Sequence, residues 1–153
     1  MASVSTYLIF SRQTFPAFEF YKSVFGTEYI SIMRHGDVPQ PEGQPGADEA
    51  DKNLIINVQL PILGGHILMG SDLPEGMGIT LTAGNNIQIC LQPDTRSDAD
   101  ILFAALTDGG TVKTPMQDMF WGDYYGELVD KFGILWLINT SSKELIGGGE
   151  AGR

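Results

Sequence analysis

The chain has 153 residues, of which 42% are hydrophobic and 18% are charged, and this size and mixture are typical of one globular domain with a hydrophobic core. Nine Lys and Arg residues against nineteen Asp and Glu residues give a net charge of -10, which repels nucleic-acid backbones and anionic membrane surfaces. The single cysteine, Cys90, excludes an intramolecular disulfide and a cysteine-based zinc cluster. Because the first residues also lack the pattern of a signal peptide, we expect a cytoplasmic protein without nucleic-acid or membrane partners.

The first half of the chain predicts a strand, a helix and three more strands. Residues 6–10 (TYLIF) are rich in aromatic and β-branched side chains, as in a strand. Further strands are expected at 28–33, 53–60 and 66–70. Between the first two strands, apolar side chains at intervals of three or four predict an amphipathic helix that ends at Gly26, and these side chains are Phe15, Phe18, Tyr21, Val24 and Phe25.

The segment 34–52 separates the second and third of these strands. It is rich in proline, glycine and charged residues, so we expect a long loop that is a candidate lid over a site. In the strand that follows, apolar residues alternate with polar ones, which predicts one buried face made of Leu54, Ile56, Val58 and Leu60.

The second half repeats this order of elements. It predicts a strand at 87–92, a helix at 97–107 that begins with a capping box of Ser97 and Asp100, and strands at 111–116, 124–129 and 134–140. The glycine-led segment 65–69 of the first half corresponds to the glycine-led segment 133–137 of the second. The glycine-rich end of the chain, 141–153, is expected to be a flexible tail.

Two such β-α-β-β-β units resemble the vicinal oxygen chelate superfamily, which includes glyoxalase I, bleomycin-resistance proteins and extradiol dioxygenases. The resemblance covers residues 6–140. Within the superfamily, four segments are similar to the PhnB-like branch, also called demethylubiquinone methyltransferase-like: 17–26 (AFEFYKSVFG), 68–72 (LMGSD), 120–122 (FWG) and 130–136 (DKFGILW).

The resemblance implies an α+β fold of the glyoxalase/bleomycin-resistance type. Its two tandem βαβββ halves, at about 6–72 and 86–140, would form a single domain spanning 1–140, with a curved mixed sheet around a cavity and the helices outside. A homodimer is also expected from the resemblance. In the segment 130–133 we expect a tight turn, in which Gly133 takes a positive φ.

The superfamily commonly holds a divalent metal ion at four inward-facing positions. Carried over to this chain, these positions fall on Thr6 or its neighbour Tyr7, and on Met69, Gln88 and Leu137. Of these residues, only Gln88 is a suitable ligand. We therefore predict no metal site and no other cofactor, and we disfavour a divalent metal without excluding it.

The two histidines do not complete such a set. His66 lies beside a turn, and strand alternation directs it away from Met69. His35 opens the long loop, from which it could close over a ligand. For both residues a structural or solvated role is favoured over a role in a site.

The resemblance instead implies a cavity for a small molecule. Alternation along the strands places amide and apolar side chains together, which suggests a neutral guest that forms hydrogen bonds. The same amides could also line a solvated sheet face or a dimer contact. The predicted ligand-binding residues are Asn57, Gln59, Met69, Ser71, Gln88, Cys90, Trp121, Leu137 and Asn139.

The sequence offers one pair of candidate catalytic residues. Tyr125 and Glu127 share one face of a predicted strand, and a buried carboxylate near a phenol can transfer protons, so they are weak candidates. Cys90 is expected to be a small buried apolar residue rather than a nucleophile, and Trp136 is expected in the core. Asp72 fits a turn first and a cavity rim second.

Three functional hypotheses follow. The first is a metal-independent protein that binds a small, neutral organic molecule. The second is a metal-dependent lyase or oxygenase-type enzyme acting on a small metabolite with non-standard ligands such as Gln88, Glu127 and His35. The third is a regulatory or structural dimer without a ligand. A methyltransferase is disfavoured, because the chain has no G-x-G-x-x-G turn for a nucleotide-like methyl donor.

Overall fold

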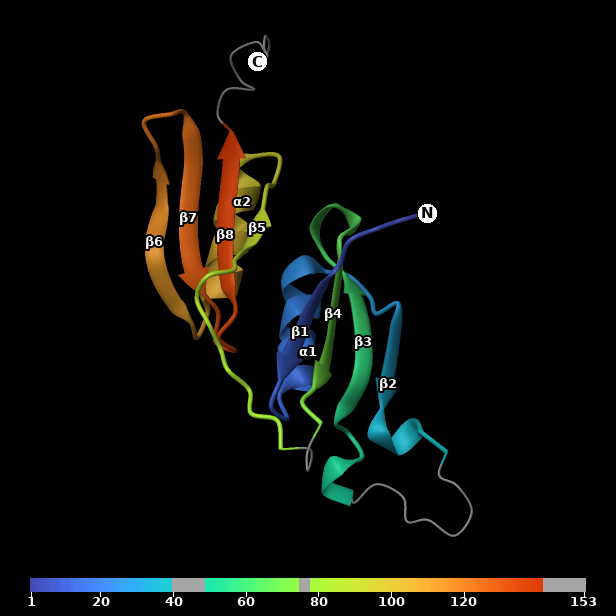
Figure 1. Cartoon of the computed structure of the whole chain (residues 1–153). Coiled ribbons are helices and arrows are strands. Elements are labelled where there is room, and N and C mark those ends of the chain that lie inside the picture. Colours follow the sequence, from blue (N-terminus) through green and yellow to red (C-terminus); the bar gives the residue numbers. More distant parts are fainter. Residues whose placement is uncertain (40–48, 75–77, 142–153) are drawn as a thin grey trace. The chain divides into compact units, whose positions relative to one another are not determined.

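The computed structural model describes residues 1–39, 49–74 and 78–141. The chain divides into two compact units, Met1–Thr82 and Ala83–Arg153 (Figure 1). Within the described residues, each unit contains one α-helix and one four-stranded mixed sheet. Residues 40–48 of the predicted loop and 142–153 of the predicted tail lie outside the described residues, while Ser141 belongs to the last strand.

The first unit has the sheet order β1-β4-β3-β2. The outer strand β1 pairs parallel to β4, and the other pairs are antiparallel. Short 3-10 turns occupy His35–Asp37, Glu49–Asp51 and Leu63–Gly65. The main elements are β1 (Thr6–Phe10), α1 (Thr14–Phe25), β2 (Ser31–Arg34), β3 (Ile55–Pro61) and β4 (Ile67–Asp72).

The second unit has the equivalent sheet order β5-β8-β7-β6, again with a parallel pair between its first and last strands. Its elements are β5 (Ile89–Leu91), α2 (Arg96–Thr107), β6 (Thr111–Asp118), β7 (Asp123–Val129) and β8 (Leu135–Ser141). None of the helices in the described ranges combines the length and the apolar character needed to cross a membrane.

The strand registers show that the two units are copies of one plan. Met69 of β4 lies between Tyr7 and Gln59 on the neighbouring strands. In the second unit, Leu137 lies in the same way between Cys90 and Glu127. The predicted βαβββ repeat and the α+β fold class are therefore confirmed.

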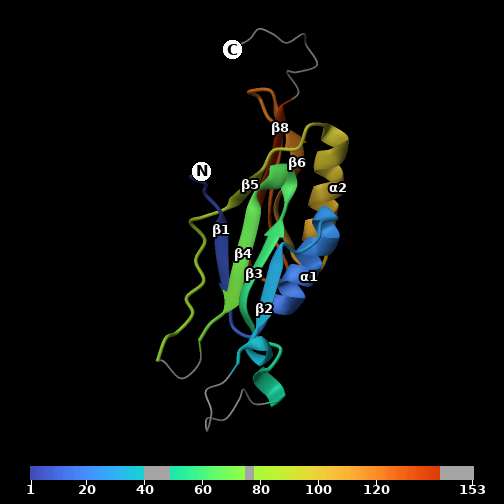
Figure 2. The ribbon, with the colours of Figure 1, turned by 90° about the vertical axis from the view of Figure 1, so that its right-hand side faces the viewer.

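Helix α1 lies along one face of the first sheet (Figure 2). Its apolar stripe buries Ala17, Phe18 and Tyr21 completely, and it ends at Gly26, which has φ 66° as predicted. The ring of Phe18 lies so close to Gly70 that a Cβ there would come within 2.6 Å of it. The absence of a side chain at Gly70 thus allows this helix to pack closely on the sheet.

The carboxylate of Asp72 joins three parts of the first unit. It accepts hydrogen bonds from the backbone N–H and the hydroxyl of Thr14, at 3.1 and 2.9 Å, and from the backbone N–H of Ile55, at 2.7 Å. Asp72 is only 6% exposed, so the prediction that it is a turn or rim residue is wrong. It stabilises the first turn of α1, whose N–H groups have no partner within the helix.

Helix α2 begins one residue earlier than predicted and has a different cap. The side chain of Thr95 accepts a hydrogen bond from the backbone N–H of Asp98, at 3.0 Å. The predicted capping box of Ser97 and Asp100 is therefore wrong by two residues. Its spacing of three residues was right, since Thr95 and Asp98 have the same separation.

The turn between β7 and β8 is built around the buried carboxylate of Asp130. This carboxylate accepts bonds from the N–H groups of Phe132 and Ile134 and from the indole Nε1 of Trp136, at 2.8, 3.1 and 2.8 Å. Gly133 has φ 91°, and Trp136 is fully buried, so the turn and the core position of Trp136 are confirmed. The segment DKFGILW is thus a structural motif of this unit.

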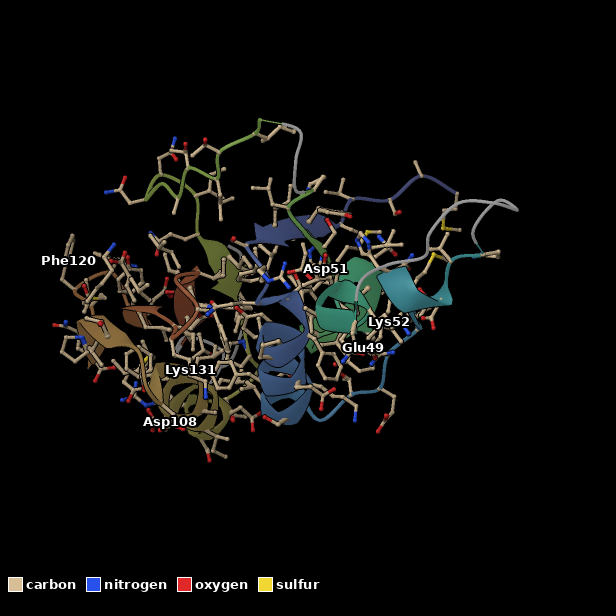
Figure 3. The ribbon with its side chains drawn as sticks, turned by 90° about the horizontal axis from the view of Figure 1, so that it is seen from below. Glu49, Asp51, Lys52, Asp108, Phe120 and Lys131 are labelled. Carbon is tan, nitrogen blue, oxygen red and sulfur yellow. The ribbon has the colours of Figure 1, made fainter. Side chains whose placement is uncertain are left out.

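Two details of the first unit differ from the predictions. Arg34 belongs to β2 rather than to the loop, and the described end of that loop is held by Arg12, which bonds to Ala50 and Asp51; Figure 3 labels Asp51 in this turn. The second difference concerns β3, where Ile55 is buried and Ile56 is not. A register shift opposite Met33 and Arg34 reverses the alternation at that point.

The Asp130→Ala variant tests the carboxylate-centred turn. It leaves the N–H groups of Phe132, Ile134 and Trp136 without this acceptor, and unpaired buried donors cost about 1–3 kcal/mol each. We expect the free energy of unfolding, measured by denaturant titration, to fall by at least about 2 kcal/mol. The control Asp94→Ala removes an exposed carboxylate, and an equal loss in both variants would contradict the assigned role.

The Gly70→Ala variant tests the close packing of α1 on the first sheet. The added methyl group would collide with the Phe18 ring and with the carbonyl oxygen of Leu8, 3.0 Å away. We expect a loss of about 1–3 kcal/mol in the free energy of unfolding, as for other overpacked cores. In Gly84→Ala the nearest atom is 3.5 Å away, so this control should be close to neutral.

Candidate functional site

In each unit one face of the sheet is covered by the helix, and the predicted site residues lie on the other face. In β7 and β8 the residues that alternate with the site residues are buried, and they include Leu128, Trp136 and Ile138. We call the opposite surface the open face of the second sheet. It is formed by Cys90, Tyr125, Glu127, Leu137 and Asn139.

Strand pairing brings these five residues together. Glu127 lies beside Leu137, which in turn lies beside Cys90 on β5. Tyr125 lies beside Asn139 on the next rung of the same pair of strands. The parallel β5–β8 pair therefore unites residues that are far apart in the sequence.

Tyr125 and Glu127 form a hydrogen-bonded pair on this face. The phenol O–H donates to Oε2 of Glu127. This bond, together with partial burial and the negative charge of Glu127, raises the pKa of Tyr125 to about 12, because all three disfavour the phenolate. At neutral pH the pair therefore consists of a neutral phenol that orients a carboxylate.

Trp121 joins the open face from the turn between β6 and β7. Its indole Nε1 donates to Oδ2 of Asp123, at 3.1 Å, and its ring meets the ring of Tyr125 edge to face, with 6.3 Å between centroids. Trp121 remains 42% exposed. It thus anchors its own turn and at the same time borders the open face.

Phe120 stands next to Trp121 at the tip of this turn. Its ring contacts the Trp121 ring edge to face, at 4.9 Å between centroids, and it is 96% exposed. Figure 3 shows Phe120 at the outer edge of the second unit. The segment FWG therefore places an exposed aromatic surface at the end of β6 and β7. This surface is not part of the hydrophobic core.

Two of the predicted residues, Cys90 and Gln88, lie on β5 and directly before it. Cys90 is exposed, so the expectation of a buried side chain is wrong, because it lies on the face that the helix leaves uncovered. Partial burial of the thiol raises its pKa, which agrees with a poor nucleophile. Gln88 precedes the strand, which is shorter than predicted, and its Oε1 is buried without a hydrogen-bond partner among the described residues.

The remaining predicted residues belong to the open face of the first sheet. Met69 and Ser71 lie on β4, and Asn57 and Gln59 lie on β3, all of them half-buried. The register also adds three residues that the sequence analysis did not include among the ligand-binding residues, which are Tyr7, Ile9 and Met33. They are exposed apolar side chains, and the signal that identifies them is the pairing of β1 with β4 and of β2 with β3.

The residues at the positions of the superfamily's metal ligands do not form a standard metal site. Met69 and Leu137 offer no oxygen or nitrogen donor in their side chains. Thr6 is bonded through its hydroxyl to Nε2 of His66, at 2.8 Å, which gives His66 a structural partner. Across residues 1–39, 49–74 and 78–141, no group of three His, Cys, Asp or Glu side chains is placed to hold one metal ion.

The alternative ligand set of Gln88, Glu127 and His35 stays a prediction. His35 lies in a 3-10 turn of the first unit, where its backbone N–H bonds to the carbonyl of Leu54, at 2.9 Å. Gln88 and Glu127 belong to the second unit. The chemistry that the second unit does present is therefore hydrogen bonding and aromatic contact.

Known proteins resemble this chain in sequence and in structure. No family model matches the chain. The protein Mb0911c of Mycobacterium bovis is 31% identical over 135 residues, which cover 84% of this chain and 77% of that protein. The crystal structure of PA1353 from Pseudomonas aeruginosa is 30% identical, with a TM-score of 0.78 over 92% of this chain and 98% of that one.

Two further solved structures share this fold and carry a family name. The PhnB protein of Bacillus cereus is 23% identical, with a TM-score of 0.69 over 92% of this chain and all of that one. A glyoxalase/bleomycin resistance protein/dioxygenase family enzyme from Burkholderia phytofirmans is 20% identical, with a TM-score of 0.59, and the match covers 89% and 97% of the two chains.

This chain has the fold of glyoxalase/bleomycin-resistance/dioxygenase proteins. Mb0911c and PA1353 are its relatives in sequence, and the PhnB protein shares its fold. At identities of 20 and 23% the last two structures establish the fold and not the activity. The function of this chain must therefore be argued from its own side chains.

The Glu127→Gln variant tests the pair on the open face. Loss of the carboxylate charge should lower the pKa of Tyr125 from about 12 towards about 10, the ordinary value for tyrosine. The measurement is an alkaline titration followed by NMR of ring-labelled tyrosine, with the signal assigned through Tyr125→Phe.

The matched control for this titration is Asp100→Asn. Asp100 accepts the O–H bond of a different tyrosine, Tyr124, at 2.6 Å, and raises the pKa of that residue. The control should therefore lower the pKa of Tyr124 and leave that of Tyr125 unchanged. An unchanged pKa of Tyr125 in Glu127→Gln would contradict the pair.

Proposed function

We propose that this chain binds a small, neutral organic molecule on the open face of its second sheet, without the usual metal centre of the superfamily it resembles. The observation that carries the proposal is the open face of the second sheet. It offers hydrogen-bonding groups, an apolar surface and aromatic rings where a standard site would offer metal ligands. Such a mixture is typical of sites for small organic ligands.

The charges near this face disfavour an anionic ligand. Strands β5, β7 and β8 contain no Lys or Arg, so they offer no ion-pair partner to a carboxylate or a phosphate. Glu127 would repel such a group at close range. The net charge of -10 adds a long-range repulsion of anions.

Gln88 supports a ligand that donates hydrogen bonds. A buried oxygen without a donor lowers the stability of the protein by about 1–3 kcal/mol. The O–H or N–H group of a ligand could satisfy this oxygen, and an engaged ligand would then stabilise the folded chain. Unpartnered buried polar atoms of this kind are uncommon in folded proteins.

An enzymatic function is the second proposal, and the Tyr125–Glu127 pair favours it. A carboxylate held by a phenol can accept a proton from a bound molecule. A metal-dependent lyase or oxygenase-type reaction would in addition require non-standard ligands. Stoichiometric divalent metal in protein purified without chelator or nickel resin would favour this reaction over simple binding. A cytoplasmic location and a homodimer remain predictions.

A binding screen with two variants tests the first proposal. Neutral organic compounds are screened for those that raise the melting temperature of the chain. For a compound that binds, Gln88→Leu and Asn139→Leu should each weaken the affinity about tenfold, since a lost hydrogen bond costs about 1.4 kcal/mol. The control is Asn85→Leu, in an exposed loop, which should leave the affinity unchanged.

Tryptophan fluorescence provides an independent readout of the same binding. Trp121 is partly exposed beside the open face, whereas Trp136 is fully buried in the core. Binding should change the fluorescence of the chain, and Trp121→Phe should remove this change. Binding that raises the melting temperature equally in all variants would place the ligand elsewhere and contradict the proposal.

A further inference from the structure

We propose that the ligand is a neutral aromatic molecule with an O–H or N–H donor on the edge of its ring, and that Glu127 accepts the hydrogen bond of this donor. The inference rests on the proposed function and names the ligand class. It follows from how Trp121, in the turn before β7, and Tyr125 and Glu127, on β7, use their polar atoms.

The aromatic residues of this face have already used their donors. The indole N–H of Trp121 is bonded to Asp123, and the phenol O–H of Tyr125 is bonded to Glu127. What these two side chains still offer is the surface of their rings. An aromatic ligand can therefore pack against Trp121, which is 42% exposed, without displacing either bond.

Glu127 has acceptor capacity that the protein does not use. Its Oε2 accepts the Tyr125 bond, and no bond to its Oε1 is formed by the residues that the structure describes. An ionised carboxylate can accept about four hydrogen bonds. The bond from Tyr125 orients the carboxylate, so that Tyr125 acts as a positioning residue for the second oxygen.

The neighbours of Glu127 favour a neutral donor over a charged one. Leu137 lies directly beside it on β8, and Cys90 lies beyond on β5. An ammonium group placed there would lose hydration next to apolar side chains, and it would gain a carboxylate that is already partly engaged. A hydroxyl or amine on a ring loses less hydration and keeps its flat apolar body on the same surface.

A matched series of probes tests this inference on the whole chain. The probes are 4-ethylphenol, 4-ethylaniline, 4-ethylanisole, 4-ethylbenzoate and 4-ethylbenzylammonium, and their affinities are measured by ligand-observed NMR titration. We expect the phenol to bind about tenfold more tightly than the anisole, which has no donor, because a hydrogen bond to a charged group contributes about 1.5–3 kcal/mol. The aniline decides between O–H and N–H donors, and the benzoate should bind more weakly than the anisole.

Two variants separate the hydrogen bond from the aromatic contact. Glu127→Ala should bring the affinity of the phenol down to that of the anisole and leave the anisole unchanged. Trp121→Ala should weaken both probes by a similar factor of a few. The buried Trp136 gives a fluorescence check that each variant is folded, and Asp108→Ala, at the exposed end of α2, is the control.

Different failures have different meanings. Equal binding of phenol and anisole, with no effect of Glu127→Ala, would overturn the inference, while the proposed function would stand on the screen with Gln88 and Asn139. Tighter binding of the ammonium probe would overturn both the inference and the neutral ligand. An absence of binding by every aromatic probe would overturn the inference even if aliphatic compounds bind.

Discussion

Each unit depends on the parallel pairing of its first and last strands, β1 with β4 and β5 with β8. Two parallel strands cannot be joined by a tight turn, so the chain between them must cross over, and a helix is the usual connection. In both units this helix covers one face of the sheet. The opposite face is left for other uses, and the side chains that alternate with the core residues lie on it.

Buried carboxylates complete this arrangement in both units, at different places. Asp72 connects the end of β4 with the start of α1 and with β3. Asp130 holds the turn before β8 and the indole of Trp136. A buried carboxylate is costly unless it is well bonded, and each of these two accepts three bonds. The segment DKFGILW thus has a structural role, because its Asp130 stabilises the turn before β8.

The segment FWG, by contrast, does not belong to the buried core. Phe120 and Trp121 are exposed at a strand turn, and the contact of Trp121 with Tyr125 extends the open face of the second sheet. Along this face the donors of the aromatic side chains are engaged, while no residue that the structure describes bonds to Oε1 of Glu127. The superfamily fold therefore presents here a surface for hydrogen bonding and ring packing, at positions where metal ligands would be oxygen or nitrogen donors.

The sequence by itself determined the order of elements, the repeat, the turn at Gly133 and the core position of Trp136, because these depend on local spacing and on backbone conformations that few residues adopt. Tertiary structure decided the rest. The buried role of Asp72 and the shift that buries Ile55 arise from pairing with distant strands, and the exposure of Cys90 depends on which face the helix covers. Only the register of β5, β7 and β8 brings the residues of the candidate site side by side, since hydrogen bonds between strands join positions that local patterns cannot relate.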